Sequence, residues 1–128
     1  MTKRVIVDTD ILVDFFHNQK YAKNLIRELV AKDAACTSIL SIAELRAVFT
    51  SHKAQYFLPK LYEMLVVVSV SVEIAELGGK FRFEFGSKGK SLSTIDALIA
   101  ATAIIEEYQL ATRNKKDFPM PQLKLYPL

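Results

Sequence analysis

The sequence predicts an α/β fold in which a mainly parallel sheet carries helices on both faces. Short apolar segments rich in β-branched residues alternate along the chain with segments of helical periodicity, which is the pattern of parallel sheets. Right-handed crossovers then place helices on both faces of the sheet. The 128 residues are 51% hydrophobic and 24% charged, and no linker or repeat divides them. We therefore expect a single domain over residues 1–128.

The first half of the chain is predicted to contain two strands and four helices. The expected strands are 4–7 and 35–38, and the expected helices begin near Ile11 and cover 20–32, 41–50 and 57–65. Asp10 is placed to cap the first helix, and Ser41-x-x-Glu44 has the form of a capping box that opens the third. Apolar residues at helical spacing indicate the second helix. Pro59 is expected in the first turn of the fourth.

The second half is predicted to add three strands and two helices. The expected strands are 66–72, 110–112 and 123–126, and the expected helices are 74–85 and 97–108, with a loop at 86–91. Phe81, Phe83 and Phe85 alternate with period two, which makes a strand the rival prediction for 74–85. On the helical alternative, Phe83 lies off the buried face and is available for a partner contact. Ser93-Thr-Ile-Asp96 resembles a second helix cap.

Charge and composition exclude several classes of protein. The net charge is +3, and the excess lies in residues 79–128, which hold eight basic and five acidic side chains. This bias permits a polyanionic partner without demonstrating one. The single cysteine, Cys36, excludes an intrachain disulfide and a zinc site built of cysteines, so we expect it to be a small buried residue. No apolar stretch approaches the ~20 residues of a membrane span, and we expect a cytoplasmic protein.

Acidic residues follow the predicted strands or open the predicted helices. Sites in parallel sheets lie beyond the carboxyl ends of the strands, where Asp8, Glu44 and Asp96 would converge. Carboxylates so close repel one another unless a cation sits between them, and oxygen ligands suit Mg²⁺ or Mn²⁺. Such an ion can activate water for attack on a phosphodiester. Each acid also has a local alternative, because helix N-termini favour carboxylates as caps.

Four motifs resemble those of PIN-domain ribonucleases and occur in the order of that family. They are Val5–Asp14, Ser38–Leu45, Leu92–Ala103 and Leu110–Phe118. The length and the fourth motif look most like the toxins of VapBC toxin–antitoxin systems. The resemblance implies a three-layer α/β/α sandwich in which Asp8, Glu44 and Asp96 hold Mg²⁺ or Mn²⁺ and activate water. It also implies an RNA substrate, a small VapB-like antitoxin that covers the site, and a homodimer.

The fourth motif departs from the family pattern. Many members carry an acid where this sequence has Asn114, so a second metal ion is an open question. Asp117 either substitutes for that acid or caps a surface turn. Thr112 and Thr9 are placed to hydrogen-bond the site carboxylates, with local turns as the alternative.

Basic residues flank the expected site. Arg113, Lys115 and Lys116 either attract RNA phosphates or form a solvated loop. A second basic group precedes Asp96 and consists of Lys80, Arg82, Lys88 and Lys90. His17 and His52 lie outside the motifs and are expected at the surface, and Asp14 is expected to face solvent or to be paired.

Two other functions remain open from the sequence. A haloacid-dehalogenase-type phosphatase would use Asp8 as nucleophile and Asp10 as acid and base, but Leu12 stands where that family has Thr or Val. A PIN-like domain that binds RNA or protein without cutting is the third hypothesis, and Asn114 is the residue that favours it.

Overall fold

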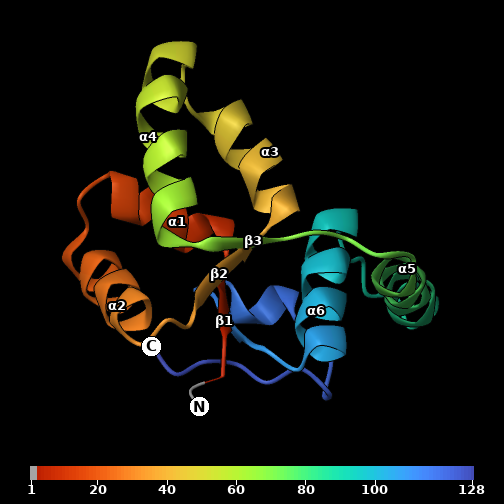
Figure 1. Ribbon diagram of the computed structural model, residues 1–128. Coiled ribbons are helices and arrows are strands. Elements are labelled where there is room, and N and C mark those ends of the chain that lie inside the picture. The colour runs from red at the N-terminus through yellow and green to blue at the C-terminus, as the bar shows by residue number, and fades with distance from the viewer. Residues whose placement is uncertain (1–2) are drawn as a thin grey trace.

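A four-stranded sheet forms the centre of the molecule (Figure 1). The computed structural model describes residues 3–128; residues 1–2, the start of the predicted domain, lie outside the described residues. The strand order is β3-β2-β1-β4, and every neighbouring pair is parallel. The strands are β1 (Val5–Val7), β2 (Ala35–Ser38), β3 (Val66–Val68) and β4 (Gln109–Ala111). All four carboxyl ends therefore lie along one edge of the sheet.

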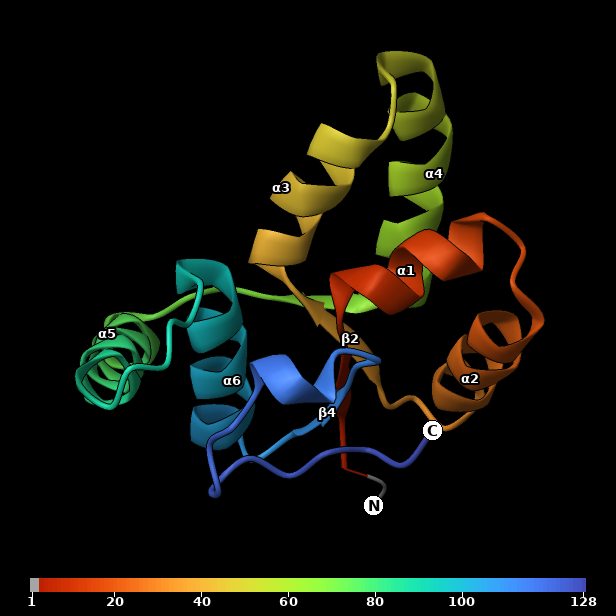
Figure 2. The same cartoon turned by 180° about the vertical axis from the view of Figure 1, so that it is seen from behind.

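Helices cover both faces of this sheet (Figures 1 and 2). They are α1 (Thr9–Phe16), α2 (Lys20–Ala31), α3 (Ile39–Val48), α4 (Ser51–Met64), α5 (Val72–Ser87) and α6 (Thr94–Glu106), followed by the short 3₁₀ helix η1 (Lys115–Asp117). Val5 and Val7 join an apolar core with α1–α4, whereas Ile6 joins a second core with α5 and α6. This alternation follows the period of two in a strand. The predicted α/β/α sandwich with a parallel sheet is confirmed.

The N-terminal ends of the first helices differ from the prediction. Asp8, not Asp10, is the N-cap of α1, because its Oδ1 accepts a hydrogen bond from the Thr9 amide at 2.9 Å. Ser38, not Ser41, caps α3, and its Oγ accepts from the Leu40 amide at 3.1 Å. The predicted capping box of Ser41 and Glu44 is therefore wrong, since both residues lie inside the helix.

The fourth helix begins earlier than predicted. Thr50 caps α4 by accepting a hydrogen bond from the Lys53 amide at 3.3 Å, so the helix starts at Ser51. Pro59 consequently lies in the helix interior and not in the first turn. The predicted helix at 20–32 and the strand at 35–38 are confirmed as α2 and β2.

Residues 72–87 form a helix, which settles the strand alternative for the phenylalanine-rich segment. Gly78 allows α5 to pack closely on α6, because a Cβ at this position would lie 2.7 Å from Leu98 Cδ2 and 3.3 Å from Leu98 Cα. Ser71 caps α5, which shortens the predicted strand 66–72 to β3 and moves the loop predicted at 86–91 toward 88–93. Phe83 is 78% exposed, as the helical prediction implies.

The C-terminal segment contains two further differences. The Ser93 cap is confirmed, because its Oγ accepts from the Asp96 amide at 3.0 Å, but α6 starts at Thr94 instead of Ala97. The strand predicted at 123–126 is wrong, since only one isolated bridge joins Leu110 and Leu125. Across residues 3–128, no helix is long and apolar enough to cross a membrane.

Candidate functional site

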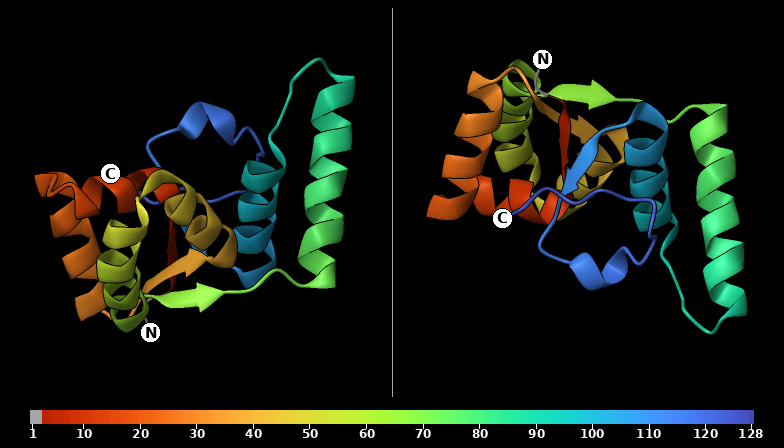
Figure 3. Two further views of the ribbon diagram at one scale, coloured as in Figure 1. Left: turned by 90° about the horizontal axis from the view of Figure 1, so that it is seen from above. Right: turned by 90° about the horizontal axis from the view of Figure 1, so that it is seen from below.

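The carboxyl edge of the sheet brings together segments that are far apart in the sequence. Seen from above in Figure 3, the N-terminal ends of α1, α3 and α6 surround this edge, with η1 beside them. Asp8 follows β1 directly, Glu44 lies in α3, and Asp96 lies in the first turn of α6. The charge of Asp96 acts on Asp8, and the charges of Glu44 and Asp10 act on Asp96. The three acids singled out from the sequence therefore face one polar edge.

Asp8 is the most deeply buried acid of this group. Its side chain is 6% exposed, and its two oxygens accept hydrogen bonds from the Thr9 amide at 2.9 Å and the Thr112 hydroxyl at 2.8 Å. Burial, followed by the charges of Asp10 and Asp96, raises the pKa of Asp8 to about 7 against the pull of these two donors. A buried carboxylate with this pKa is costly to ionise unless a cation joins it.

Glu44 is held by hydroxyl groups. The Thr9 hydroxyl donates to Glu44 Oε1 at 2.5 Å and lies 2.8 Å from the hydroxyl oxygen of Ser41. Ser41 is fully buried, so this pair of hydroxyls joins the start of α1 to α3. The hydrogen bonds predicted from Thr9 and Thr112 to site carboxylates are both confirmed. The part played by Ser41 was missed, because its spacing to Glu44 matched a helix cap.

Asp96 and Asp117 form the other side of the cluster. Burial raises the pKa of Asp96, and the neighbouring charges of Asp117, Glu44 and Asp10 raise it further, against the Ser93 hydrogen bond. Asp117 is the last residue of η1 and is half-buried. It lies near Asp96, because its charge is one of those that raise the pKa of Asp96.

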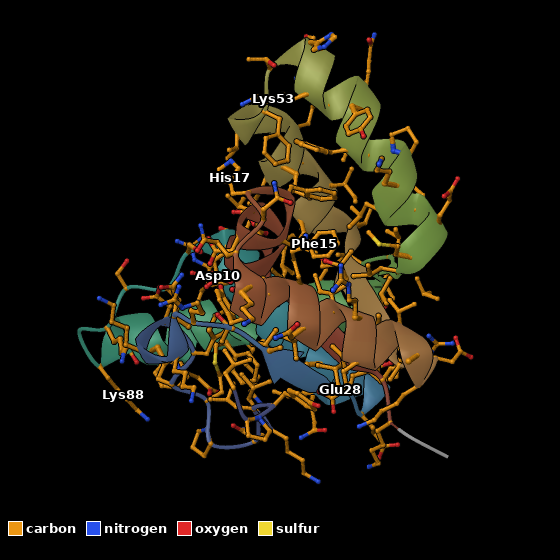
Figure 4. All side chains as sticks on the ribbon, turned by 90° about the vertical axis from the view of Figure 1, so that its left-hand side faces the viewer. Asp10, Phe15, His17, Glu28, Lys53 and Lys88 are labelled. Atoms are coloured by element: carbon orange, nitrogen blue, oxygen red, sulfur yellow. The ribbon has the colours of Figure 1, made fainter. Side chains whose placement is uncertain are left out.

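Asp10 and Asn114 lie at the open margin of the site. Asp10 accepts from the Ile11 amide at 2.8 Å and from the Arg113 amide at 3.0 Å, while burial raises its pKa. Asn114 is exposed, and its backbone N–H donates to the Thr112 hydroxyl oxygen at 3.1 Å. Asp10, Val13, Asp14, Arg113 and Asn114 line an open pocket of about 400 Å³. Figure 4 shows Asp10 on the side of α1 away from the labelled Glu28.

The basic residues near the site fall into two groups. Lys115 and Lys116 are exposed on η1 and form no ion pair within residues 3–128. Arg113 is engaged, since its guanidinium lies 3.4 Å from Asp14 Oδ2 and 5.0 Å from the centre of the Tyr21 ring. Arg82 fixes α5 to the start of α6 by donating to Leu92 O and Thr94 Oγ1, both at 3.0 Å.

Three other sequence predictions can be placed. Asp14 is paired, with Arg113 and with the Tyr21 hydroxyl, which donates to it. His17 and His52 are exposed. Cys36 is buried in the second core, and burial raises the pKa of its thiol to about 12, so it is an inert small residue.

The donor set fits a hard divalent cation. Asp8, Glu44 and Asp96 offer only carboxylate oxygens, and none of the ion pairs within the described part of the chain involves them. In residues 3–128 no group of three or more Asp, Glu, His or Cys side chains is arranged so that it could hold a metal ion. The carboxylates are held by Thr9, Thr112 and backbone donors instead.

Several known proteins are similar to this chain in sequence and structure. The family model described as PIN domain matches residues 5–120. The chain is 31% identical over 117 residues to "Ribonuclease VapC19" of Mycobacterium tuberculosis, a match that covers 90% of this chain and 92% of the relative.

Solved structures show the same arrangement of elements. A structure of VapBC2 from Rickettsia felis bound to a promoter DNA fragment matches with a TM-score of 0.82 and 26% identity, over 95% of this chain and 96% of that chain. A toxin–antitoxin complex from Klebsiella pneumoniae matches with a TM-score of 0.73 and 26% identity, over 98% and 100% of the two chains. The chain therefore belongs to the PIN domain family.

Proposed function

We propose that the protein is a Mg²⁺- or Mn²⁺-dependent endoribonuclease and the toxin of a toxin–antitoxin pair. The observation that carries this proposal is the cluster of Asp8, Glu44 and Asp96, which have hydroxyl and amide partners but no basic partner among residues 3–128. The relative named a ribonuclease and the similar toxin–antitoxin complex support the same function.

The proposed mechanism assigns distinct roles to the residues of the cluster. Asp8, Glu44 and Asp96 would hold the divalent cation, which when bound supplies Lewis-acid activation of water and of the scissile phosphate. Thr112 orients Asp8, and Thr9 orients Glu44, because each hydroxyl donates to one carboxylate oxygen. These fixed orientations keep the acids close to one another in spite of their repulsion.

Asn114 limits the number of metal ions that we propose. The side-chain amide of Asn114 offers a carbonyl oxygen without a negative charge. Asn114 lines the open pocket at the margin of the cluster. Three carboxylates suffice for one cation. Asp117 adds negative charge beside Asp96, and we propose that this charge adjusts the electrostatic potential on that side of the site.

The surfaces around the site suggest how partners are recruited. Lys115 and Lys116 are free to attract RNA phosphates that the carboxylates would otherwise repel. We propose a small VapB-like antitoxin and a second copy of this chain as protein partners, with action on RNA in the cytoplasm. Phe83 is a candidate residue for one of these protein contacts because 78% of it is exposed.

Binding of RNA or protein without cleavage is the second candidate function, and Asn114 at the position of the fourth acid favours it. The phosphatase alternative gains no support, because the family model that matches residues 5–120 is the PIN domain.

The test is cleavage of several RNAs by purified, antitoxin-free protein with Mn²⁺ or Mg²⁺ and with a chelator. We expect cleavage by the wild type that is lost with chelator and in Asp8→Asn and Asp96→Asn. Glu28→Gln, which changes an exposed acid on α2, is the matched control and should cut normally. Equal cleavage by all variants would refute the site, and no cleavage by the wild type would favour the binding function.

A further inference from the structure

Three distant segments meet beside the acid cluster at Asp14, Tyr21 and Arg113. Asp14 lies near the end of α1, Tyr21 lies in the first turn of α2, and Arg113 follows β4. In Figure 2 the loop that follows β4 reaches toward α1 and α2. Asp14 and Arg113 are 99 positions apart in the sequence, so this contact closes the fold at the margin of the site.

The side chains of Asp14, Tyr21 and Arg113 contact one another. The Tyr21 hydroxyl donates to Asp14 Oδ2, and the same oxygen lies 3.4 Å from the Arg113 Nη1. The guanidinium also lies over the Tyr21 ring, with its central carbon 5.0 Å from the ring centre, at the distance of a cation–π contact. The Arg113 side chain is therefore directed toward α1 and α2.

The backbone around Arg113 continues these contacts into the acid cluster. The Arg113 amide donates to Asp10 Oδ2 at 3.0 Å, and the Asn114 amide donates to the Thr112 hydroxyl oxygen at 3.1 Å. Because that oxygen accepts from Asn114, the Thr112 proton is free to point at Asp8 Oδ2, 2.8 Å away. A continuous path of hydrogen bonds thus runs from the loop to the buried carboxylate.

We propose that Asp14, Tyr21 and Arg113 form a clasp that holds the loop after β4 so that Thr112 and the Arg113 amide position Asp8 and Asp10. Arg113 is then a positioning residue and not a ligand for RNA phosphates. The effect of the clasp on catalysis rests on the proposed nuclease function. Its effect on the loop does not, because every contact in it belongs to the protein alone.

The opposite role for Arg113 makes a different prediction for its partner. If Arg113 bound RNA phosphates, Asp14 would compete with the substrate for the guanidinium, and its removal would strengthen RNA binding. If the three residues form a clasp, removal of Asp14 loosens the loop and weakens catalysis. The variant Asp14→Asn therefore separates the two roles.

The experiment compares Asp14→Asn, Arg113→Gln and the double variant with the wild type in RNA cleavage at a fixed Mn²⁺ concentration. Tyr21→Phe removes only the hydroxyl and keeps the ring. Glu28→Gln is the matched control, because it removes the charge of the exposed pair between Glu28 and Lys32, 2.9 Å apart at the C-terminal end of α2, and changes no member of the clasp. Amide hydrogen exchange of residues 110–117 is measured in the same proteins without metal or RNA.

For a clasp, Asp14→Asn and Arg113→Gln each lower kcat by about ten- to a hundredfold, as for other residues that orient metal ligands, and leave KM for RNA unchanged. The double variant is no worse than either one, and exchange in the loop accelerates. Tyr21→Phe shows the same pattern with a smaller change. Glu28→Gln changes neither measurement.

Unchanged hydrogen exchange of residues 110–117 in Asp14→Asn and Arg113→Gln would decide against the clasp. Tighter RNA binding by Asp14→Asn together with a raised KM and a weaker salt dependence in Arg113→Gln would identify Arg113 as a phosphate ligand. If the wild type cuts no RNA, the proposed function fails, while the exchange data alone confirm or reject the clasp.

Discussion

Asp8 and Asp14 lie at opposite ends of the same short helix and have opposite surroundings. Asp14 has the Arg113 guanidinium and the Tyr21 hydroxyl beside it. Asp8 is buried, faces Asp10 and Asp96, and has a pKa raised to about 7. The acid at the C-terminal end of α1 is thus compensated by the protein itself. The acid at its N-terminal end is compensated only in part, which leaves a role for a cation.

The buried polar residues of the protein gather at the edge of the sheet where Asp8 lies. The buried polar residues are Asp8, Thr37, Ser38, Ser41, Thr102 and Thr112. All of them except Thr102 lie at or just beyond the carboxyl ends of the strands. Hydroxyl groups there donate to carboxylates or to backbone oxygens, as Thr37 does to Val7 O at 2.9 Å. This edge is built to keep carboxylates oriented in a partly desolvated place.

The largest expected effect comes from removing a negative charge from the cluster of Asp8, Glu44 and Asp96. Glu44→Gln keeps the shape of the side chain but removes one negative charge from the proposed cation site. The cleavage rate should fall by about 10²–10³-fold, because a bound cation contributes several kcal/mol to transition-state stabilisation. Steady-state RNA cleavage with Mn²⁺ measures this.

The matched control is Glu63→Gln, which changes an exposed glutamate on the neighbouring helix α4 and should leave cleavage unchanged. A normal cleavage rate for Glu44→Gln would show that Glu44 is not a ligand of the cation.

The two ends of α1 should also differ in their effect on stability in metal-free protein. Because the pKa of Asp8 is raised from 3.8 to about 7, the stability supplied by its protonated form is present below pH 4 and is lost as the pH rises to 7. Asp8→Asn should therefore increase the free energy of unfolding at pH 8 by about 2 kcal/mol, since a pKa unit corresponds to about 1.4 kcal/mol and part is lost with the altered hydrogen bonds.

Asp14→Asn should instead lower the free energy of unfolding, by at most about 1 kcal/mol, as for other exposed ion pairs. Denaturant unfolding at pH 5 and pH 8 in the presence of chelator measures both variants. A loss of stability in Asp8→Asn at pH 8 would show that the Asp8 carboxylate is well compensated after all.

The hydroxyl that orients Asp8 offers a smaller perturbation. Thr112→Val removes the donor to Asp8 Oδ2 at nearly constant volume, and we expect Mn²⁺ affinity and cleavage to fall about tenfold. Thr112→Ser retains the hydroxyl and should restore most of both. Isothermal titration with Mn²⁺ and cleavage assays provide the measurements.

Thr102→Val is the control for this prediction, because the Thr102 hydroxyl donates within α6 to Leu98 O at 2.7 Å and lies outside the acid cluster. If Thr102→Val and Thr112→Val had equal effects, the loss would reflect general packing and not the orientation of Asp8.

The smallest effect is expected from adding an acid at the margin. Asn114→Asp places a new carboxylate in the exposed pocket beside Asp10, where solvent screens its charge. Mn²⁺ affinity should rise by about threefold, within the range of weak, screened surface interactions. Cleavage at limiting Mn²⁺ should increase accordingly, and a decrease would mean that the Asn114 amide has a role that a carboxylate cannot fill.

The sequence predicted the architecture, the three acids and the hydrogen bonds of Thr9 and Thr112 to site carboxylates, but not the arrangement of Ser41 and Glu44 within α3. Alternating strands and helices were enough for the parallel sheet and its two helical layers. The Ser-x-x-Glu spacing of Ser41 and Glu44 matched a helix cap, and only the contact with Thr9, 32 and 35 positions away, shows their actual arrangement. Local patterns carry no information about such distant partners.

The Arg113 side chain illustrates the same limit for charged residues. Its place next to Lys115 and Lys116 predicted a basic loop, whereas its partners Asp14 and Tyr21 come from α1 and α2. Which cation of a basic loop is free and which is paired depends on the packing of helices, and this could not be predicted from composition or spacing.

The central claim is that Asp8, Glu44 and Asp96 together hold one divalent cation. The most direct test is isothermal titration of antitoxin-free protein with Mn²⁺, comparing the wild type with Asp8→Asn, Glu44→Gln and Asp96→Asn, and with Glu28→Gln as control. We predict one saturable site in the wild type and in the control that is lost or strongly weakened in each of the three variants. Wild-type Mn²⁺ binding by all three variants would contradict the claim.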